Sequence, residues 1–103
     1  MELRYHKEVV KFIAALDKIP KGKVLRLVDH LEKFGFTLRM PDSKPVTSGL
    51  FELRARGILE VRILYAFKDG KAILLHAFVK KTGTIARSDI ALALQRYRAL
   101  DVL

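Results

Sequence analysis

The sequence predicts an α+β fold in which two helices precede three antiparallel strands and a third helix follows them. Three observations predict it. Apolar residues recur at helical spacing between residues 7 and 35, the period falls to two between residues 50 and 80, and helical spacing returns from about Thr84. With 103 residues the chain has room for one core, so we expect a single domain over residues 1–103.

The first third of the chain carries the two helical patterns. Residues 1–5 are long enough only for a short strand. From Lys7 to about Asp17 the apolar residues fall at i, i+3, i+4 and i+7, and after a break at Pro20 and Gly22 a second pattern ends at Phe34-Gly35. These segments predict a helical hairpin. Residues 36–49 contain two prolines and several turn formers, and they predict a long connecting loop.

Residues 50–55, 59–68 and 71–80 are rich in β-branched and aromatic side chains, which predicts three strands. Asp69-Gly70 is a strong signal for a two-residue hairpin turn. A regular register from this turn pairs Lys68 with Lys71 and Arg62 with Ala77. It then places Lys81 on the same face as Arg62, with Lys80 at the rim of the sheet.

The preceding hairpin has two possible loops. A two-residue loop at Arg56-Gly57 would mix apolar and polar faces, whereas a loop of residues 56–58 gives a consistent pattern. The longer loop pairs Leu53 with Val61, Arg54 with Glu60, and Glu52 with Arg62. We therefore expect a polar cluster on the face away from the helical core, made of Glu52, Arg54, Glu60 and Arg62.

The composition favours a polyanionic partner. The formal net charge is +9, so the surface should attract nucleic acid, although a basic protein that binds an acidic partner would show the same charge. Cysteine is absent, no apolar run reaches the roughly 18 residues of a membrane span, and the start MELRYHKEVV lacks a secretory apolar region. These features predict a cytoplasmic protein without a membrane role.

Lysine and arginine side chains are the main candidate functional groups in the sequence. The three histidines show no metal-ligand spacing, and no glycine-rich phosphate loop or nucleophile elbow is present, so we expect no metal and no cofactor. Guanidinium and ammonium groups can bind phosphate and stabilise a phosphoryl transition state. A metal-free ribonuclease needs these cations together with a proton acceptor and a proton donor.

Each candidate also has a purely structural interpretation. Arg54 and Arg62 can be cross-strand partners of the two glutamates, and Lys80 and Lys81 can be a solvated strand end. His76 has aromatic and aliphatic neighbours that suit a core position. Tyr65 shares that face and is expected in the core, with its hydroxyl at the edge.

The second half of the chain resembles the phage-derived, HigB-like branch of the RelE/ParE toxin superfamily. The resemblance rests on a series of motifs in order: Glu52-Leu53-Arg54, Arg62 with Tyr65, then Phe78-Val79-Lys80-Lys81-Thr82 and a closing helix rich in Ala and Leu. It covers Gly49 to about Tyr97, and it implies a RelE-like fold.

The resemblance implies a toxin of a type II toxin–antitoxin pair that cleaves mRNA at the ribosome, by attack of the 2′-hydroxyl on the adjacent phosphate without a metal. The implied partners are mRNA, the ribosome and a cognate antitoxin of the helix-turn-helix, HigA-like kind. The implied catalytic residues are Arg54, Arg62, Lys80 and Lys81. Of these, Arg54 positions substrate, while Arg62 and either Lys80 or Lys81 bind the phosphate and stabilise the charge of the transition state. The expected RNA-binding residues are Arg56, Lys80, Lys81 and Arg87.

Two alternative functions stay open. A non-cleaving member of the same fold could inhibit gyrase, as the ParE branch does, or bind only antitoxin or nucleic acid. An unrelated basic adaptor domain would carry the same cations only as a solvated surface. RelE-type enzymes also place an aromatic or basic residue after the last central strand, where this chain has Thr82-Gly83-Thr84. The sequence therefore assigns no general base: a lysine whose pKa is lowered by its cationic neighbours could serve, and so could His76 if the register differs from the regular one.

Overall fold

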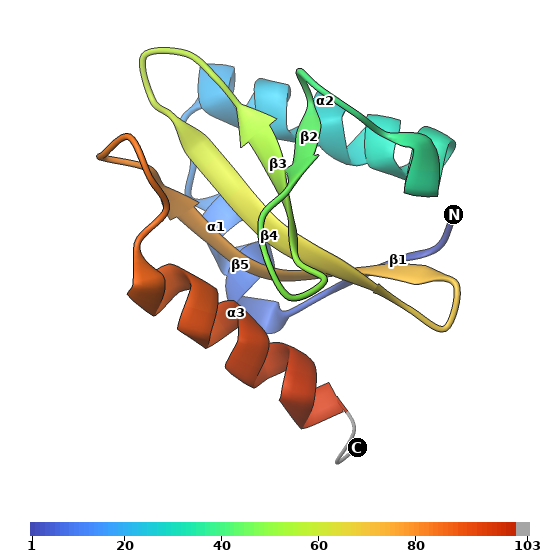
Figure 1. The fold of residues 1–103 in the computed structure, drawn as a ribbon. Coiled ribbons are helices and arrows are strands. Elements are labelled where there is room, and N and C mark those ends of the chain that lie inside the picture. Colours follow the sequence, from blue (N-terminus) through green and yellow to red (C-terminus); the bar gives the residue numbers. More distant parts are fainter. Residues whose placement is uncertain (101–103) are drawn as a thin grey trace.

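The computed structural model describes residues 1–100 and confirms the α+β class (Figure 1). The N-terminal part contains β1 (Leu3–Tyr5), α1 (Lys7–Ala14), α2 (Lys18–Phe34) and a 3₁₀ turn, η1 (Gly35–Thr37). It is followed by β2 (Ser43–Pro45), β3 (Phe51–Ala55), β4 (Val61–Lys68), β5 (Lys71–Val79) and α3 (Arg87–Ala99). None of the helices within residues 1–100 is long and apolar enough to cross a membrane.

The strands form one five-stranded mixed sheet in the order β1-β5-β4-β3-β2. The three predicted strands are its antiparallel centre. The prediction of a purely antiparallel sheet was incomplete, because β1 joins β5 in parallel and β2 adds an antiparallel edge beside β3. Strand β2 lies inside the segment that was predicted to be a connecting loop.

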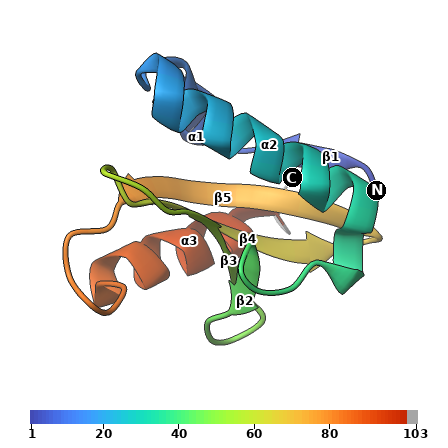
Figure 2. The ribbon, with the colours of Figure 1, turned by 90° about the horizontal axis from the view of Figure 1, so that it is seen from above.

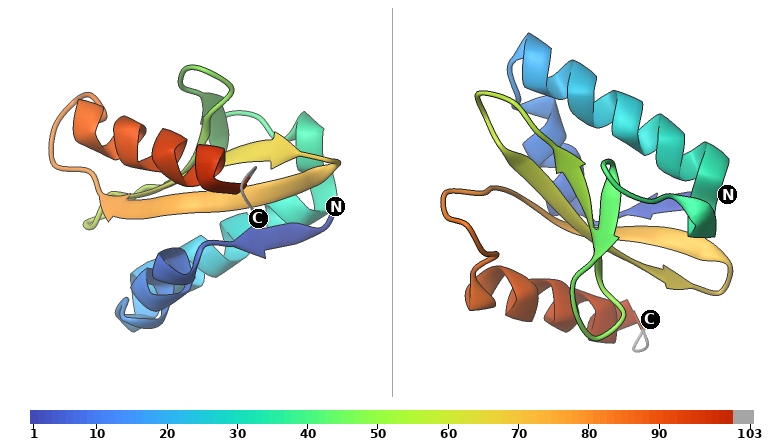
Figure 3. Two further views of the ribbon diagram at one scale, coloured as in Figure 1. Left: turned by 90° about the horizontal axis from the view of Figure 1, so that it is seen from below. Right: turned by 45° about the horizontal axis from the view of Figure 1, so that its top comes forward.

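Helices cover both faces of the sheet. Helices α1 and α2 pack on one face and α3 packs on the other (Figures 2 and 3). The face under α1 and α2 buries Leu53, Ile63 and Leu74 among others, and the face under α3 buries Leu64, Leu75 and Phe78 with Ala93 of the helix. The expectation that the second face lies away from the helices was therefore wrong.

The helical hairpin is confirmed, but its break was misplaced. Helix α1 ends at Ala14 and α2 begins at Lys18, so Pro20 and Gly22 lie inside α2. Pro20 is the third residue of that helix, where a backbone N–H would have no partner within the helix, so proline costs little there. The C-terminal helix begins at Arg87 rather than Thr84.

The turn between β4 and β5 has the predicted form. Asp69 and Gly70 both have positive φ, 53° and 74°, and Lys68 pairs with Lys71 as predicted. Further along, Tyr65 pairs with Leu74 while Leu64 pairs with His76, which leaves Leu75 as an extra residue in β5.

This bulge reverses the faces of the rest of β5. Arg62 opposes Phe78 and not Ala77, so the predicted register was wrong beyond Leu75. His76 and Phe78 consequently lie on the face of Arg62, under α3, and Ala77 packs into the opposite core.

The connection between β3 and β4 also differs from the prediction. It spans residues 56–60, and Arg54 pairs with Arg62 while Leu53 pairs with Ile63. This register is two residues away from the predicted one. Because side chains alternate with a period of two, the shift leaves each residue on its predicted face. Glu52, Arg54 and Arg62 therefore do share one face, but it is the face of α3.

Candidate functional site

Strand pairing arranges the polar side chains of the α3 face in cross-strand rows. Lys44 of β2 pairs with Glu52 of β3, and Arg54 of β3 pairs with Arg62 of β4. Residues two positions apart along a strand are about 6.6 Å apart, so the two rows are close neighbours. Glu60 and Lys80 form a third row beside these two, because the backbone N–H of Lys80 donates to the carbonyl of Glu60 at 2.7 Å.

Glu52 is the centre of this cluster. Its side chain is fully buried, and its carboxylate lies 3.4 Å from Nε of Arg54, 3.7 Å from Nε of Arg62 and 3.8 Å from Nζ of Lys44. Neither carboxylate oxygen has a hydrogen-bond partner within residues 1–100, so these contacts are ionic. One buried negative charge thus holds three cations together.

Arg62 is buried as deeply as Glu52, with 2% of its surface exposed. It donates from Nη2 to Oε1 of Glu60 and from Nη1 to the carbonyl of Val61, each at 3.0 Å. A backbone hydrogen bond from Gly57, and then the one from Arg62, lower the pKa of Glu60. The Arg62 guanidinium is therefore enclosed by the protein, and its charge reaches the surface of the sheet only as a positive field.

Arg54 lies nearer to solvent. Its Nη1 donates to Sδ of Met40 at 3.2 Å and lies 3.4 Å from the carbonyl of Pro41, and 11% of the side chain is exposed. Arg56 is mostly exposed and reaches Glu60 only at 4.0 Å. The cations thus become more accessible toward the edge and the end of the sheet.

A cleft of about 250 Å³ opens beside the cluster. Its lining includes Lys44 and Glu52 from the sheet, Lys80, Gly83 and Thr84 from the segment after β5, and Ile90 from α3. Lys80 forms no ion pair with any residue of the described range 1–100. Its ammonium is therefore available to an anionic ligand.

The expectation that Lys81 shares the face of Arg54 and Arg62 was wrong. The bulge at Leu75 reverses the alternation, so Lys80 lines the cleft while Lys81 is exposed and lies outside its lining. Arg87 is also exposed and outside the lining. Lys44 was not predicted as a site residue, because a strand of three residues is too short to show an alternation of polar and apolar side chains. Only the pairing of Lys44 with Glu52 could have indicated its position.

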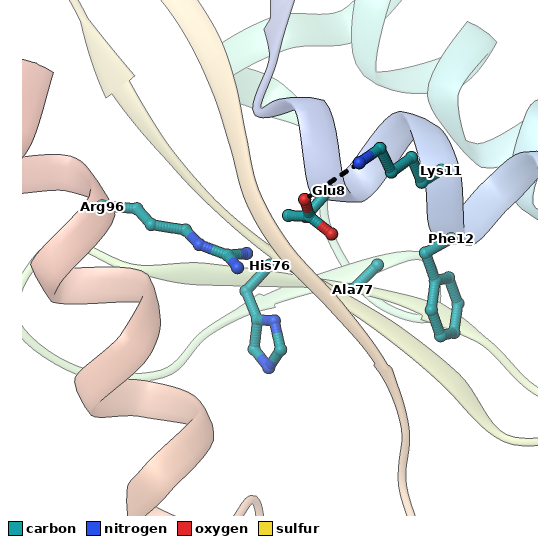
Figure 4. Close-up of a pocket in the computed structure, with 6 residues that line it drawn as sticks. All are labelled: Glu8, Lys11, Phe12, His76, Ala77 and Arg96. Carbon is teal, nitrogen blue, oxygen red and sulfur yellow. Dashed lines mark hydrogen bonds and ion pairs between the residues drawn. The ribbon is translucent and has the colours of Figure 1, made fainter.

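His76 lies in a different cleft, which occupies about 360 Å³ between α1 and α3 (Figure 4). Its Nε2 lies 2.7 Å from Oδ1 of Asp89, and its ring stacks on Phe78. Arg96 of α3 donates to the carbonyl of Leu75 at 2.8 Å beside it. The histidine is on the face that the altered register requires, but the structure places it with Asp89 and not with Lys80.

Tyr65 lies in the core as predicted, but its hydroxyl is buried and not at the edge. It is buried in the sheet, and its hydroxyl lies 2.6 Å from Oγ of Ser43, which is buried on β2. Burial raises the pKa of Tyr65. This contact fastens β2, and with it Lys44, to the centre of the sheet.

Within residues 1–100 no group of three or more His, Cys, Asp or Glu side chains could hold a metal ion.

Comparison with known families places this chain beside phage-derived proteins. The family described as phage-derived protein Gp49-like (DUF891) matches residues 11–98, which include every strand of the sheet except β1. The chain belongs to this Gp49-like family. The family is of the RelE and toxin-like kind, in agreement with the order of motifs around Glu52, Arg62 and Lys80. A search of curated proteins found no match for this Gp49-like chain.

Proposed function

We propose that this Gp49-like protein is the toxin of a type II toxin–antitoxin pair, of the HigB-like branch, and that it cleaves mRNA on the ribosome without a metal. The observation that carries the proposal is the position of Lys80. This cation, which has no ion-pair partner within residues 1–100, lines a cleft beside the buried carboxylate of Glu52 and the three further cations around it. Such an arrangement suits a phosphate that gains negative charge during reaction.

In the proposed reaction the 2′-hydroxyl oxygen attacks the adjacent phosphorus and the bond from phosphorus to the 5′-oxygen breaks. The products are a 2′,3′-cyclic phosphate and a 5′-hydroxyl, and a proton passes from the attacking to the leaving oxygen. Lys80 binds the non-bridging oxygens, Arg54 positions the strand, and Arg62 adds positive potential from beneath. The titratable groups lining the cleft are Lys44, Glu52 and Lys80, so these groups or water carry the proton.

The exposed cations outside the cleft have a supporting role in this proposal. Arg56, Lys81 and Arg87 contact phosphates on either side of the cleaved bond, where each adds affinity that weakens with salt. The antitoxin is a helix-turn-helix protein that covers the cationic face. Capture of the product of the neighbouring gene by the tagged protein tests this partner.

Expression of the chain alone in bacteria, with and without single lysine changes, tests the proposal. We expect growth arrest and new mRNA 5′ ends in phase with codons. Lys80→Ala should relieve the arrest, whereas Lys81→Ala, which removes an equal charge one residue away, should leave most of it. Normal growth at confirmed soluble expression would contradict a toxin. Arrest with intact messages and damaged DNA would instead identify a gyrase inhibitor of the ParE kind.

A further inference from the structure

We infer that the cleft beside Lys80 is a binding site for one nucleotide of single-stranded RNA, with Lys44 and Lys80 at its phosphate and an aliphatic wall against its base. The inference rests on the proposed function and adds to it a residue, Lys44, that no motif assigns. It also names the form of RNA that the site accepts.

The position of Lys44 is fixed by its strand. Lys44 pairs with Glu52, and its neighbour Ser43 holds the hydroxyl of Tyr65 at 2.6 Å in the core. The next residue but one, Val46, donates from its backbone N–H to the carbonyl of Leu50 at 2.8 Å. The Lys44 side chain is nevertheless 46% exposed, so its ammonium faces both the buried carboxylate and the cleft.

The charges around the cleft favour an anion. Glu52 contributes one negative charge, and two buried or nearly buried arginines already lie within 3.7 Å of it. The charge of Lys44 is therefore in excess, and Lys80 has no partner within residues 1–100. Two ammonium groups that line one small cleft can bind a phosphodiester between them.

The remaining walls favour a base beside that phosphate. Pro45 and Val46 line the cleft from the β2 side, and Ile85 and Ile90 line it from the side of α3. A free phosphate would leave these apolar surfaces in water, whereas the face of a base would cover them. A ligand with an anionic and a flat apolar part matches both halves of the lining.

The size of the cleft limits the ligand to one nucleotide. Its volume of about 250 Å³ is below the range of roughly 300 Å³ and more that is usual for drug-sized ligands. A base inside a duplex is stacked and paired, so its face cannot reach such a cleft. Recognition of unpaired bases is the common mode for RNA, and it requires a single strand.

Binding of a labelled six-nucleotide single-stranded RNA to the purified full-length protein tests the inference. We expect Lys44→Gln to weaken binding about tenfold, as for a lost charge-assisted contact, and to reduce the slope of log affinity against log salt by about 0.7. Lys33→Gln removes an exposed lysine at the end of α2 and serves as the matched control, with little change expected.

A second variant tests the apolar wall without a change of charge. Ile90→Ala should weaken binding of the RNA but leave the salt slope as in the wild type, and thermal unfolding verifies that each variant is folded. A duplex of the same sequence should bind much more weakly than the single strand. Equal effects of Lys44→Gln and Lys33→Gln would overturn the inference. Two further results would also overturn it: binding of the duplex as tight as that of the single strand, or displacement of the labelled RNA by inorganic phosphate at the same concentration at which unlabelled RNA displaces it.

The two proposals can fail separately. If RNA binding depends on Lys44 but the protein leaves messages intact in cells, the nucleotide site is supported and the nuclease is refuted. Cleavage in cells that is unchanged by Lys44→Gln would retain the nuclease and refute the nucleotide site.

Discussion

Replacing Glu52 by glutamine is expected to destabilise the protein strongly. The substitution keeps the size of the side chain and removes the single buried negative charge that faces Lys44, Arg54 and Arg62. Arg62, with 2% of its surface exposed, cannot recover water without opening the sheet. The variant therefore separates the ionic role of Glu52 from its packing.

The distances indicate the size of the effect. The carboxylate oxygens lie 3.4, 3.7 and 3.8 Å from the three cationic nitrogens. At an effective dielectric constant of about 20, each such pair has a Coulomb energy of about 4 to 5 kcal/mol before desolvation is subtracted. Removing one partner of a buried pair typically costs about 3 to 5 kcal/mol. We expect about 3 kcal/mol, because Arg62 keeps its hydrogen bonds to Glu60 and Val61.

Urea unfolding followed by circular dichroism measures this loss. For a domain of this size a change of about 3 kcal/mol lowers Tm by about 12 °C or more. Glu2→Gln is the matched control, because Glu2 forms an exposed ion pair with Arg4 and should contribute less than about 1 kcal/mol. If Glu52→Gln were as stable as Glu2→Gln, the three cations would not depend on the buried carboxylate, and the reasoning would be refuted.

Three smaller changes test other parts of the fold. Tyr65→Phe removes the buried hydroxyl contact with Ser43 and should cost about 1 kcal/mol in urea unfolding, whereas unchanged stability would show that β2 is held in another way. Gly70→Ala meets open space but a φ of 74°, so a drop in Tm that corresponds to about 1 kcal/mol is expected, and no drop would contradict the strained turn. The N–H of Gly57 lowers the pKa of Glu60, so the stabilisation by that carboxylate is complete above its unfolded pKa and disappears as pH falls through the lower folded value. Wild type should therefore exceed Glu60→Gln in Tm at pH 7 but not at strongly acid pH, and a difference that is independent of pH would contradict this cause.

Features that depend on neighbouring residues could be predicted from the sequence. The turn at Asp69-Gly70 follows from two residues that tolerate positive φ, and the stripe from Val24 to Leu31 follows from helical spacing. The polar cluster around Glu52 was predicted because alternation places residues of equal parity on one face. The predicted register was wrong by two residues, but a shift of two leaves every side chain on the same face, so the cluster was still predicted correctly.

Features that depend on distant residues could not be predicted. Strand β1 pairs with residues 72–74, almost seventy positions along the chain, and β2 has only three residues. Residues 1–5 indicated a possible short strand, which β1 confirms, but neither segment contains enough alternation to show which strand it pairs with. Lys44 was missed for this reason, since only its pairing with Glu52 brings it to the cleft.

The bulge at Leu75 decides which lysine reaches the cleft, and packing explains why the chain adopts it. Leu74 and Leu75 are both fully buried, but in cores on opposite faces, so an apolar pair here fits either register when the sequence is considered alone. Without the extra residue, Phe78 would point toward α1 and α2 and the small Ala77 toward α3. That exchange would overpack the core under α1 and α2 and leave a void under α3; overpacking alone typically costs about 1 to 3 kcal/mol, which is at least the roughly 1 kcal/mol of one hydrogen bond lost from the ladder. The fit of Phe78 under α3 thus places Lys80, two residues later, on the face of Arg62, and leaves Lys81 in solvent.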